Sequence, residues 1–374
     1  MTDISTLLVS LGLTAEQIAS RSKLAIERVV SLLAGDEAKL TEIRALSRGL
    51  RLPMRLFSSG KSPRAVNPLQ MQFRSMQGAT ADYSPTVEKV ATFVEAASKV
   101  LPARDVKPWL IRPAPLEPSL SNVKTIAANF REIIGLDDNS PATDLSHRLE
   151  YQEGLIVSVL RDSRFEGVSL SSGNYLYIFV SPRFKARMLF TLAHEIGHVL
   201  AGHVQDDAPL FEGASDIGNF RKSTKNERFV DAIAGSILLP DNGIFDFISS
   251  IRVHLNISSS SPLGDVEILL LARFFGVSFE VAGKRCEDVG LLPSGGAFAM
   301  AAELRKNHGS PERRADELGL PARSDIFFPS TSKVLRDAVN SAIEVGAESV
   351  GWAADSFGFS ISEILSGHRS GRSL

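Results

Sequence analysis

Apolar residues recur at helical spacing in three short segments near the start of the chain, and polar turns separate these segments. Thr14 is placed to cap the first helix, because a threonine hydroxyl can accept a hydrogen bond from a backbone N–H of the first turn. A second helix is expected over 24–34 and a third over 40–50. Short helices joined by tight turns are typical of a helix-turn-helix domain, so the pattern predicts an all-α domain over 1–60.

Helices and strands mix in the middle of the chain. Residues 61–122 are rich in proline around one expected helix at 86–100, which predicts a linker and helical connector. Beyond them, periodicity predicts helices, and short apolar runs predict strands. The helices are expected over 123–134 and 143–151, and the strands within 149–157, 165–169 and 175–180. Two further apolar helices, over 190–200 and 226–239, follow the strands.

The helix over 190–200 contains His194, Glu195 and His198 in a His-Glu-x-x-His arrangement. Residues i and i+4 share one face of a helix, so both imidazoles can ligate one zinc ion. Glu195 is then placed to hold a water that the metal polarises. Unpaired polar side chains in so apolar a helix would be costly to bury unless they bind something. The alternative is a surface helix on which these three residues are incidental.

Two histidines leave a catalytic zinc site one protein ligand short. Glu227 and Asp231 lie four residues apart, on one face of the helix predicted over 226–239. Such a pair can supply a ligand, Glu227, and an acceptor, Asp231, that orients a ligand histidine through its other ring N–H. The alternative is an exposed acidic edge beside Arg228. A fourth position left to water would mark the site as catalytic.

Other side chains near this helix are candidates for supporting roles. Tyr175, Tyr177 and Arg187 precede it and could reach a cleft to stabilise an oxyanion, although core packing is the alternative for both tyrosines. His203 follows it, and we expect this histidine to support a ligand or to cap the helix rather than to bind metal.

The stretches FTLAHEIGHVLAGH and NERFVDAIAGSILLP resemble the two most characteristic helices of the ImmA/IrrE family of bacterial zinc metallopeptidases. The resemblance spans about 70–245 and is sharp only at these helices. It implies a Zn²⁺ site with one catalytic base and three protein ligands, namely Glu195 and then His194, His198 and Glu227. Val230 and Asp231 stand where the family often has Cys-Asn, and Asp231 keeps a side chain that can form hydrogen bonds.

The first sixty residues resemble the XRE class of helix-turn-helix domains, which includes the Cro and C1-type repressors. The resemblance makes four residues candidates for DNA contact: Lys23, Ile26, Glu27 and Arg28. The usual turn glycine is absent, however, and residues 1–60 hold only eight basic residues against six acidic ones. That is a small positive excess for binding a duplex. The alternative is a helical domain used for dimerisation or for docking a substrate.

Composition narrows the class of protein. The 374 residues suffice for two or three domains, and the net charge of −2 requires no polyanionic partner. The single cysteine, Cys286, excludes an internal disulfide and is expected to pack as a small apolar side chain. No apolar run approaches the length that spans a bilayer, and the first residues lack a secretion signal, so we expect a cytoplasmic protein without a membrane partner.

The fold class implied by these patterns and resemblances is α+β. The all-α helix-turn-helix domain would precede a zincin-like metallopeptidase domain over 123–290, made of a small sheet and the active-site helices, and a mostly helical region over 291–374. The implied function is zinc-dependent cleavage of a specific protein, a transcriptional repressor with its own helix-turn-helix, to which the first domain brings the enzyme directly or through double-stranded DNA. The alternative is a DNA-binding regulator or antitoxin whose peptidase domain acts as sensor or scaffold.

Overall fold

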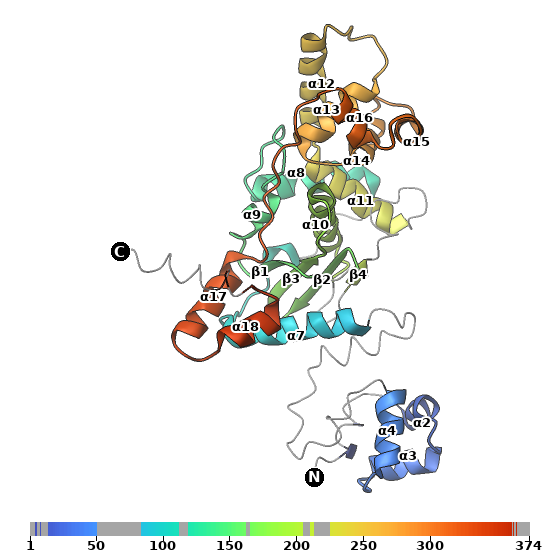
Figure 1. Ribbon diagram of the computed structural model, residues 1–374, viewed down its shortest axis with the longest axis vertical. Helices are drawn as coiled ribbons and strands as arrows, with labels where there is room; N and C mark the ends of the chain where they lie inside the picture. The colour runs from blue at the N-terminus through green and yellow to red at the C-terminus, as the bar shows by residue number, and fades with distance from the viewer. Residues whose placement is uncertain are drawn as a thin grey trace. The chain divides into compact units, whose positions relative to one another are not determined.

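The computed structural model describes residues 4, 5, 8, 14–50, 84–111, 119–161, 165–204, 210–212, 225–360, 362 and 364. They fall into two compact units, Met1–Ala91 and Thr92–Leu374, whose helices and strands are shown in Figure 1. The second unit runs across the boundaries at 122/123 and 290/291 that the sequence predicts. Residues 61–83 of the predicted connector lie outside the described residues.

Residues 14–50 of the first unit form three short helices, α2 (Ala15–Ser22), α3 (Ile26–Leu33) and α4 (Leu40–Gly49). The Thr14 hydroxyl accepts a hydrogen bond from the Gln17 N–H and caps α2 as expected. The apolar faces of the helices meet in a small core, made of Leu8, Ile18, Val29, Leu32, Leu46 and Leu50. The three helices are therefore present as predicted, and their binding to DNA stays a prediction.

The turn between α2 and α3 uses a lysine where a glycine is usual. Lys23 lies in the left-handed region with φ of 58°, a conformation that costs a residue with a side chain roughly 1–2 kcal/mol. The end of α4 comes close to this turn, since a Cβ on Gly49 would lie 2.3 Å from the Arg21 carbonyl oxygen. A glycine at this position therefore lets α4 approach the end of α2.

The second unit is built around a four-stranded sheet. Its strands are β1 (Leu155–Val159), β2 (Gly167–Ser172), β3 (Tyr175–Val180) and β4 (Leu210–Glu212), in the order β1-β3-β2-β4. β1 runs parallel to β3, whereas β2 runs antiparallel to both β3 and β4. The three predicted strands are confirmed, and β4 is a strand that the sequence did not predict.

α10 (Lys185–Leu200) packs on one face of the sheet, with α9 (Leu145–Leu149) beside β1, as Figure 1 shows. α11 (Lys225–Leu238) packs against α10, and α8 (Val123–Ile133) packs against α11. Alternate residues of β3 lie with these helices in the main apolar core, namely Leu176, Ile178 and Val180. Since α10 and α11 are the helices that carry the candidate chemistry, the sheet forms the support beneath the site.

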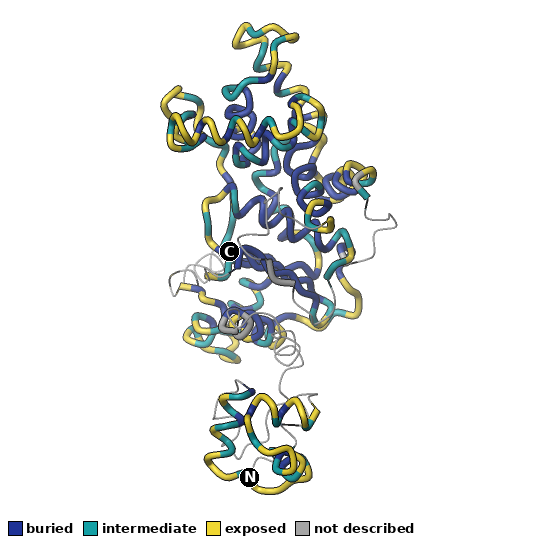
Figure 2. Tube along the Cα trace, turned by 90° about the vertical axis from the view of Figure 1, so that its right-hand side faces the viewer, coloured by how far each residue is buried: buried dark blue, intermediate teal, exposed yellow. Residues whose placement is uncertain are grey.

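The opposite face of the sheet is covered by helices from distant parts of the sequence. They are α7 (Ser84–Val100), α17 (Lys333–Glu344) and α18 (Val350–Phe357). The Phe93 ring packs edge to face against both Phe179 of β3 and Phe357, with centroids 4.9 Å apart in each pair. Because both faces are covered, every residue of β3 is buried, and most of the sheet is drawn in dark blue in Figure 2.

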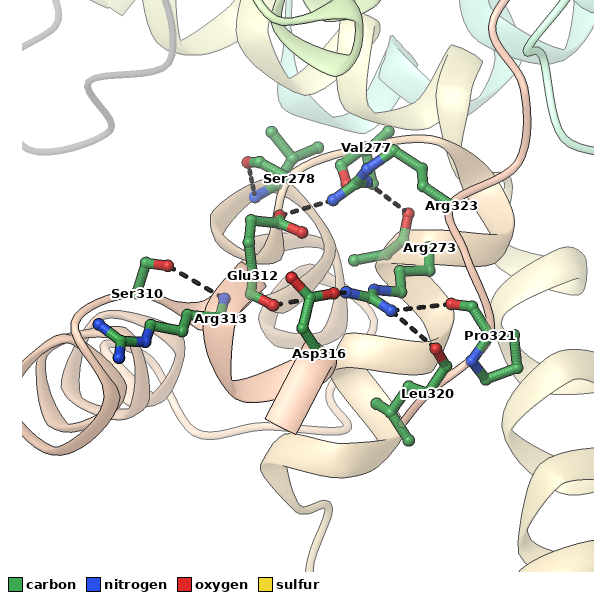
Figure 3. A network of polar contacts seen from close by, with 12 residues as sticks. Arg273, Val277, Ser278, Ser310, Glu312, Arg313, Asp316, Leu320, Pro321 and Arg323 are labelled. Carbon is green, nitrogen blue, oxygen red and sulfur yellow. Dashed lines mark hydrogen bonds and ion pairs between the residues drawn. The ribbon is translucent and has the colours of Figure 1, made fainter. Parts of the chain in front are cut away.

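Five helices extend the second unit beyond α11. They are α12 (Asp241–Leu255), α13 (Asp265–Phe275), α14 (Phe279–Asp288), α15 (Gly296–His308) and α16 (Pro311–Glu317). Two arginines tie them to the segment that follows (Figure 3). Arg273 donates to the carbonyls of Leu320 and Pro321 and pairs with Asp316, while Arg323 donates to Glu312 and to the Ala272 carbonyl. Buried Cys286 packs in the core, as predicted.

The chain then returns to the edge of the sheet before entering α17. Val159 N–H donates to the Ser330 carbonyl at 2.8 Å, and Ser332 N–H donates to the Val157 carbonyl at 2.8 Å. Short 3₁₀ turns at Trp109–Ile111 and Leu120–Asn122 precede α8. Among the described residues, no helix has the length and apolar character needed to cross a membrane.

Candidate metal centre

The three residues of the His-Glu-x-x-His arrangement lie on α10 and are all inside the protein. His194 and Glu195 have no exposed surface, and His198 is 1% exposed. Their helix is buried on almost every side between Ala186 and Val199. A surface helix with incidental histidines is therefore not what the chain forms. Burial of three ionisable groups calls for partners that offset the loss of hydration.

α11 approaches α10 closely at the glycine inside the motif. A Cβ on Gly197 would lie 2.9 Å from Cγ1 of Val230 and 3.1 Å from the Val230 carbonyl oxygen. Only a residue without a side chain lets the two helix backbones come this near. The contact places Glu227, one turn before Val230, against the two histidines, so the glycine contributes to the site without touching a ligand.

The atoms that could hold a metal form a compact triangle. His194 Nε2 lies 3.0 Å from His198 Nε2 and 3.3 Å from Glu227 Oε2, and His198 Nε2 lies 3.6 Å from the same Oε2. Tetrahedral zinc, with bonds of about 2.0–2.1 Å, separates its ligand atoms by about 3.3 Å. The triangle therefore fits a zinc ion with three protein ligands. Among the described residues these three form the group able to hold a metal ion.

Asp231 holds the His194 ring on the side opposite the triangle. Its Oδ1 lies 2.9 Å from His194 Nδ1, and its side chain is 1% exposed. An N–H at Nδ1 that donates to this carboxylate leaves the Nε2 lone pair directed at the triangle. Burial by itself lowers the pKa of His194. The hydrogen bonds to Asp231 and Glu227 outweigh this effect and raise the pKa to about 10. The carboxylates thus favour positive charge at this point.

The other two ligand groups also have shifted pKa values. Burial is the main reason that the pKa of His198 is lowered to about 4, which favours the neutral imidazole that a metal needs. Burial raises the pKa of the Glu227 carboxyl, but hydrogen bonds from His194 and His198 outweigh it and hold that pKa well below its usual range. An ionised carboxylate and a neutral imidazole are the protonation states of metal ligands.

Glu195 lies against the sheet rather than in the triangle. A Cβ on Gly167 of β2 would lie 2.1 Å from Glu195 Oε1, so this carboxylate occupies the space that a side chain there would fill. Both of its oxygens are shielded from solvent. Burial raises its pKa to about 7, although the His194 charge and the Ser169 hydroxyl lower it. A buried carboxyl with a raised pKa is suited to accepting a proton from a water that it holds.

His203 contacts His198 outside the triangle. The Nδ1 atoms of the two rings lie 2.9 Å apart, on the side of His198 away from the triangle. This agrees with the expected supporting role.

The candidates for oxyanion stabilisation lie elsewhere. Tyr177 stacks on Phe179, on the sheet face opposite α10, and the Tyr175 hydroxyl donates to the Pro102 carbonyl at 2.9 Å. Arg187 is held by Glu166, with 3.3 Å between Nε and Oε2. Both tyrosines therefore take the core alternative, because alternate residues of a strand point to opposite faces of the sheet and these two lie on the face away from α10.

The four candidate DNA contacts surround the start of α3. Lys23, Ile26 and Glu27 are exposed. Arg28 is turned toward its own unit: its guanidinium pairs with Glu42 at 2.8 Å and donates to the Glu37 carbonyl at 2.7 Å. Contact of these residues with DNA stays a prediction, and for Arg28 it would require these bonds to break.

Comparison with known proteins bears on the second unit. Residues 162–287 match the family model of the M78 peptidases, described as the IrrE N-terminal-like domain. A comparison with curated proteins gives no match. The matched range contains β2, β3, α10 and α11, and with them all the residues of the candidate site. Sequence reasoning found these residues but missed Gly167, since nothing local in the sequence indicates that a glycine on β2 faces Glu195.

Proposed function

We propose, from the premise that residues 162–287 form an IrrE-like domain of the M78 metallopeptidases, that this chain is a zinc-dependent endopeptidase with a specific protein substrate. One observation carries the proposal: two imidazoles and a carboxylate meet in a triangle of zinc-like size, and the helix of the two imidazoles also buries Glu195. A structural zinc site would close with four protein ligands, whereas this arrangement of described residues offers three.

In the proposed hydrolysis, some residues of the site hold the metal ion and another transfers a proton. His194, His198 and Glu227 would hold the zinc ion, which when bound would supply a Lewis acid that polarises the scissile carbonyl and lowers the pKa of water. Glu195 takes a proton from the attacking water on one carboxylate oxygen and returns it to the leaving amine. A pKa raised to about 7 by burial suits both transfers.

The substrate that we propose is a transcriptional repressor with its own helix-turn-helix domain. The support is the resemblance of the first unit to such domains and of the second to peptidases that cleave repressors. Because Arg28 is engaged by Glu42 within its own unit, we favour docking of the repressor itself over docking on operator DNA. The three-helix unit would then act as a docking module for the substrate.

Zinc content tests the metal site first. We expect about one zinc per wild-type chain by elemental mass spectrometry and less than about a tenth of that in Glu227→Ala, because two ligands hold zinc poorly. Glu132→Ala removes an exposed glutamate from α8 and is the matched control, with zinc as in the wild type. A folded wild-type chain that takes up no zinc after resupply would overturn the proposal.

Cleavage is tested by mapping new protein N-termini in cells of the source that express the wild type or Glu195→Gln. A new N-terminus within a repressor should appear with the wild type alone, while Glu195→Gln keeps its zinc and loses at least about a hundredfold in cleavage. Full zinc without a wild-type cleavage product would instead favour the regulator or antitoxin in which this domain is a sensor.

A further inference from the structure

The two candidate ligand histidines are supported by different kinds of partner. His194 Nδ1 lies 2.9 Å from a carboxylate, that of Asp231, whereas His198 Nδ1 lies 2.9 Å from a second imidazole, that of His203. The ring centroids of His198 and His203 are 5.2 Å apart. A carboxylate can only accept a hydrogen bond in this position. Of two facing imidazole nitrogens, by contrast, either one can carry the proton of the hydrogen bond and the other must then accept it.

The end of α10 brings His203 to this place. Gly202, with φ of 73°, lies just beyond the helix in the left-handed region. His203 N–H donates to the His198 carbonyl at 2.9 Å, and Gly202 N–H donates to the Val199 carbonyl at 3.0 Å. These two bonds define a Schellman motif, in which the side chain after the glycine contacts the residue five positions earlier. That contact is usually apolar, and here it joins two imidazoles.

We propose that His203 is a positioning residue that holds His198 in the tautomer whose Nε2 binds the metal. The inference rests on the zinc site of the proposed function. A neutral His198 that coordinates through Nε2 carries its proton on Nδ1, so Nδ1 donates and the Nδ1 of His203 accepts. Neutral His203 then carries its own proton on Nε2. The backbone hydrogen bond and the contact between the rings join the same two residues, so both interactions restrict the orientation of the His198 ring.

Zinc affinity of the full chain, measured by competition with a fluorescent chelator, tests this role. His203→Phe removes the acceptor and should weaken zinc binding by about 10–100-fold. His203→Asn places an amide oxygen where Nδ1 lies and should restore affinity to within about threefold of the wild type. The matched control is His308→Phe, since His308 likewise neighbours a glycine with positive φ at the end of a helix, but that helix is α15, which does not carry the site.

A spectroscopic measurement separates positioning from packing. In protein labelled with ¹⁵N-histidine, two-bond ¹⁵N–¹H spectra report which ring nitrogen carries the proton. In the wild type and in His203→Asn, His198 should show its proton on Nδ1 before and after zinc is added. In metal-free His203→Phe the two tautomers should mix, while far-ultraviolet circular dichroism stays unchanged.

The outcomes distinguish this inference from the function on which it rests. If the wild type binds zinc and a folded His203→Phe variant binds it with equal affinity, the proposed role of His203 is wrong, while the proposed metal site is unaffected. Equal losses in His203→Phe and His203→Asn would assign the residue to packing and also overturn it. A wild type without zinc affinity would overturn the proposed function, and this inference with it.

Discussion

One ion pair from each unit of the chain shows how burial changes the role of paired charges. In the first unit, Arg28 and Glu42 pair with side chains that are 30% and 15% exposed. In the second, His194 and Asp231 pair with side chains that are 0% and 1% exposed. Exposed pairs contribute about 0–1 kcal/mol to stability, whereas removing one partner of a buried pair costs about 3–5 kcal/mol. The burial of the second pair is therefore better explained by the chemistry of a site than by stability.

The apolar cores of the two units also differ, in this case in size. Among the described residues, the three helices of the first unit share a core of six buried apolar residues, so each of these residues carries a large share of the stability of that core. The second unit has an extensive core that reaches from α8 to α15 and surrounds the polar residues of the site. A large apolar surround can tolerate buried ionisable groups, and a small one cannot.

The largest effect is expected from Asp231→Ala. It leaves the His194 ring N–H without its acceptor inside the protein, so we expect a loss of about 3–5 kcal/mol in the free energy of unfolding and about 10–100-fold in zinc affinity. Denaturant unfolding and chelator competition measure the two effects. Asp231→Asn keeps an acceptor oxygen and should retain most of both. Equal behaviour of the two variants would contradict the view that the acceptor matters.

Leu46→Ala probes the small core. Leu46 is fully buried among five other apolar residues, and its truncation should cost about 2–5 kcal/mol, enough to unfold a unit of this size. Hydrogen exchange of the full chain, followed by mass spectrometry, should show loss of protection over 14–50 and unchanged protection over α10 and α11. Lost protection in both units would mean that they do not fold separately.

Gly197→Ala tests the close approach of α10 and α11. The added Cβ would lie 2.9 Å from Val230 Cγ1, so the helices must separate slightly, at a cost of about 1–3 kcal/mol and with weaker zinc binding. Gly351→Ala is the control, because Gly351 lies in α18 with no atom nearer than 3.8 Å to an added Cβ. That substitution should be neutral or slightly stabilising. Unchanged zinc affinity in Gly197→Ala would remove the glycine from the account of the site.

The smallest effect concerns pH and the first unit. The hydrogen bond from Arg28 is the main reason that the pKa of Glu42 is lowered to about 2. A carboxyl whose pKa is lower when folded stabilises the fold above its unfolded pKa of about 4.3, and the stabilisation disappears as the pH falls toward 2. Hydrogen-exchange protection over 14–50 should therefore decline over this range, and less steeply in Glu42→Gln. Parallel declines in both proteins would contradict this assignment.

Local patterns predicted the helices up to α11 and three of the strands, because each depends on spacing within a few turns. Glu227 became an expected ligand through a resemblance that joins two helices, since local spacing does not relate it to His198. β4 was not predicted because its three residues become a strand only by pairing with β2. Tyr177 could not be assigned to a face from sequence, since both faces of β3 are buried. His203 was expected to support the site, but its contact with His198 follows from the reversal at Gly202, which a helical projection does not include.

The strand-like contact of Ser332 with Val157 has a consequence for how the chain is made. The two residues are 175 positions apart, so β1 obtains this neighbour only after most of the chain has been synthesised. Contacts of such sequence separation form late and slow the completion of a fold. During translation the helices that carry the candidate site emerge while the edge of β1 is still uncovered, a state prone to pairing with other chains. We therefore expect a chain whose synthesis stops before α17 to contain the residues of the candidate site but to aggregate through its open sheet edge.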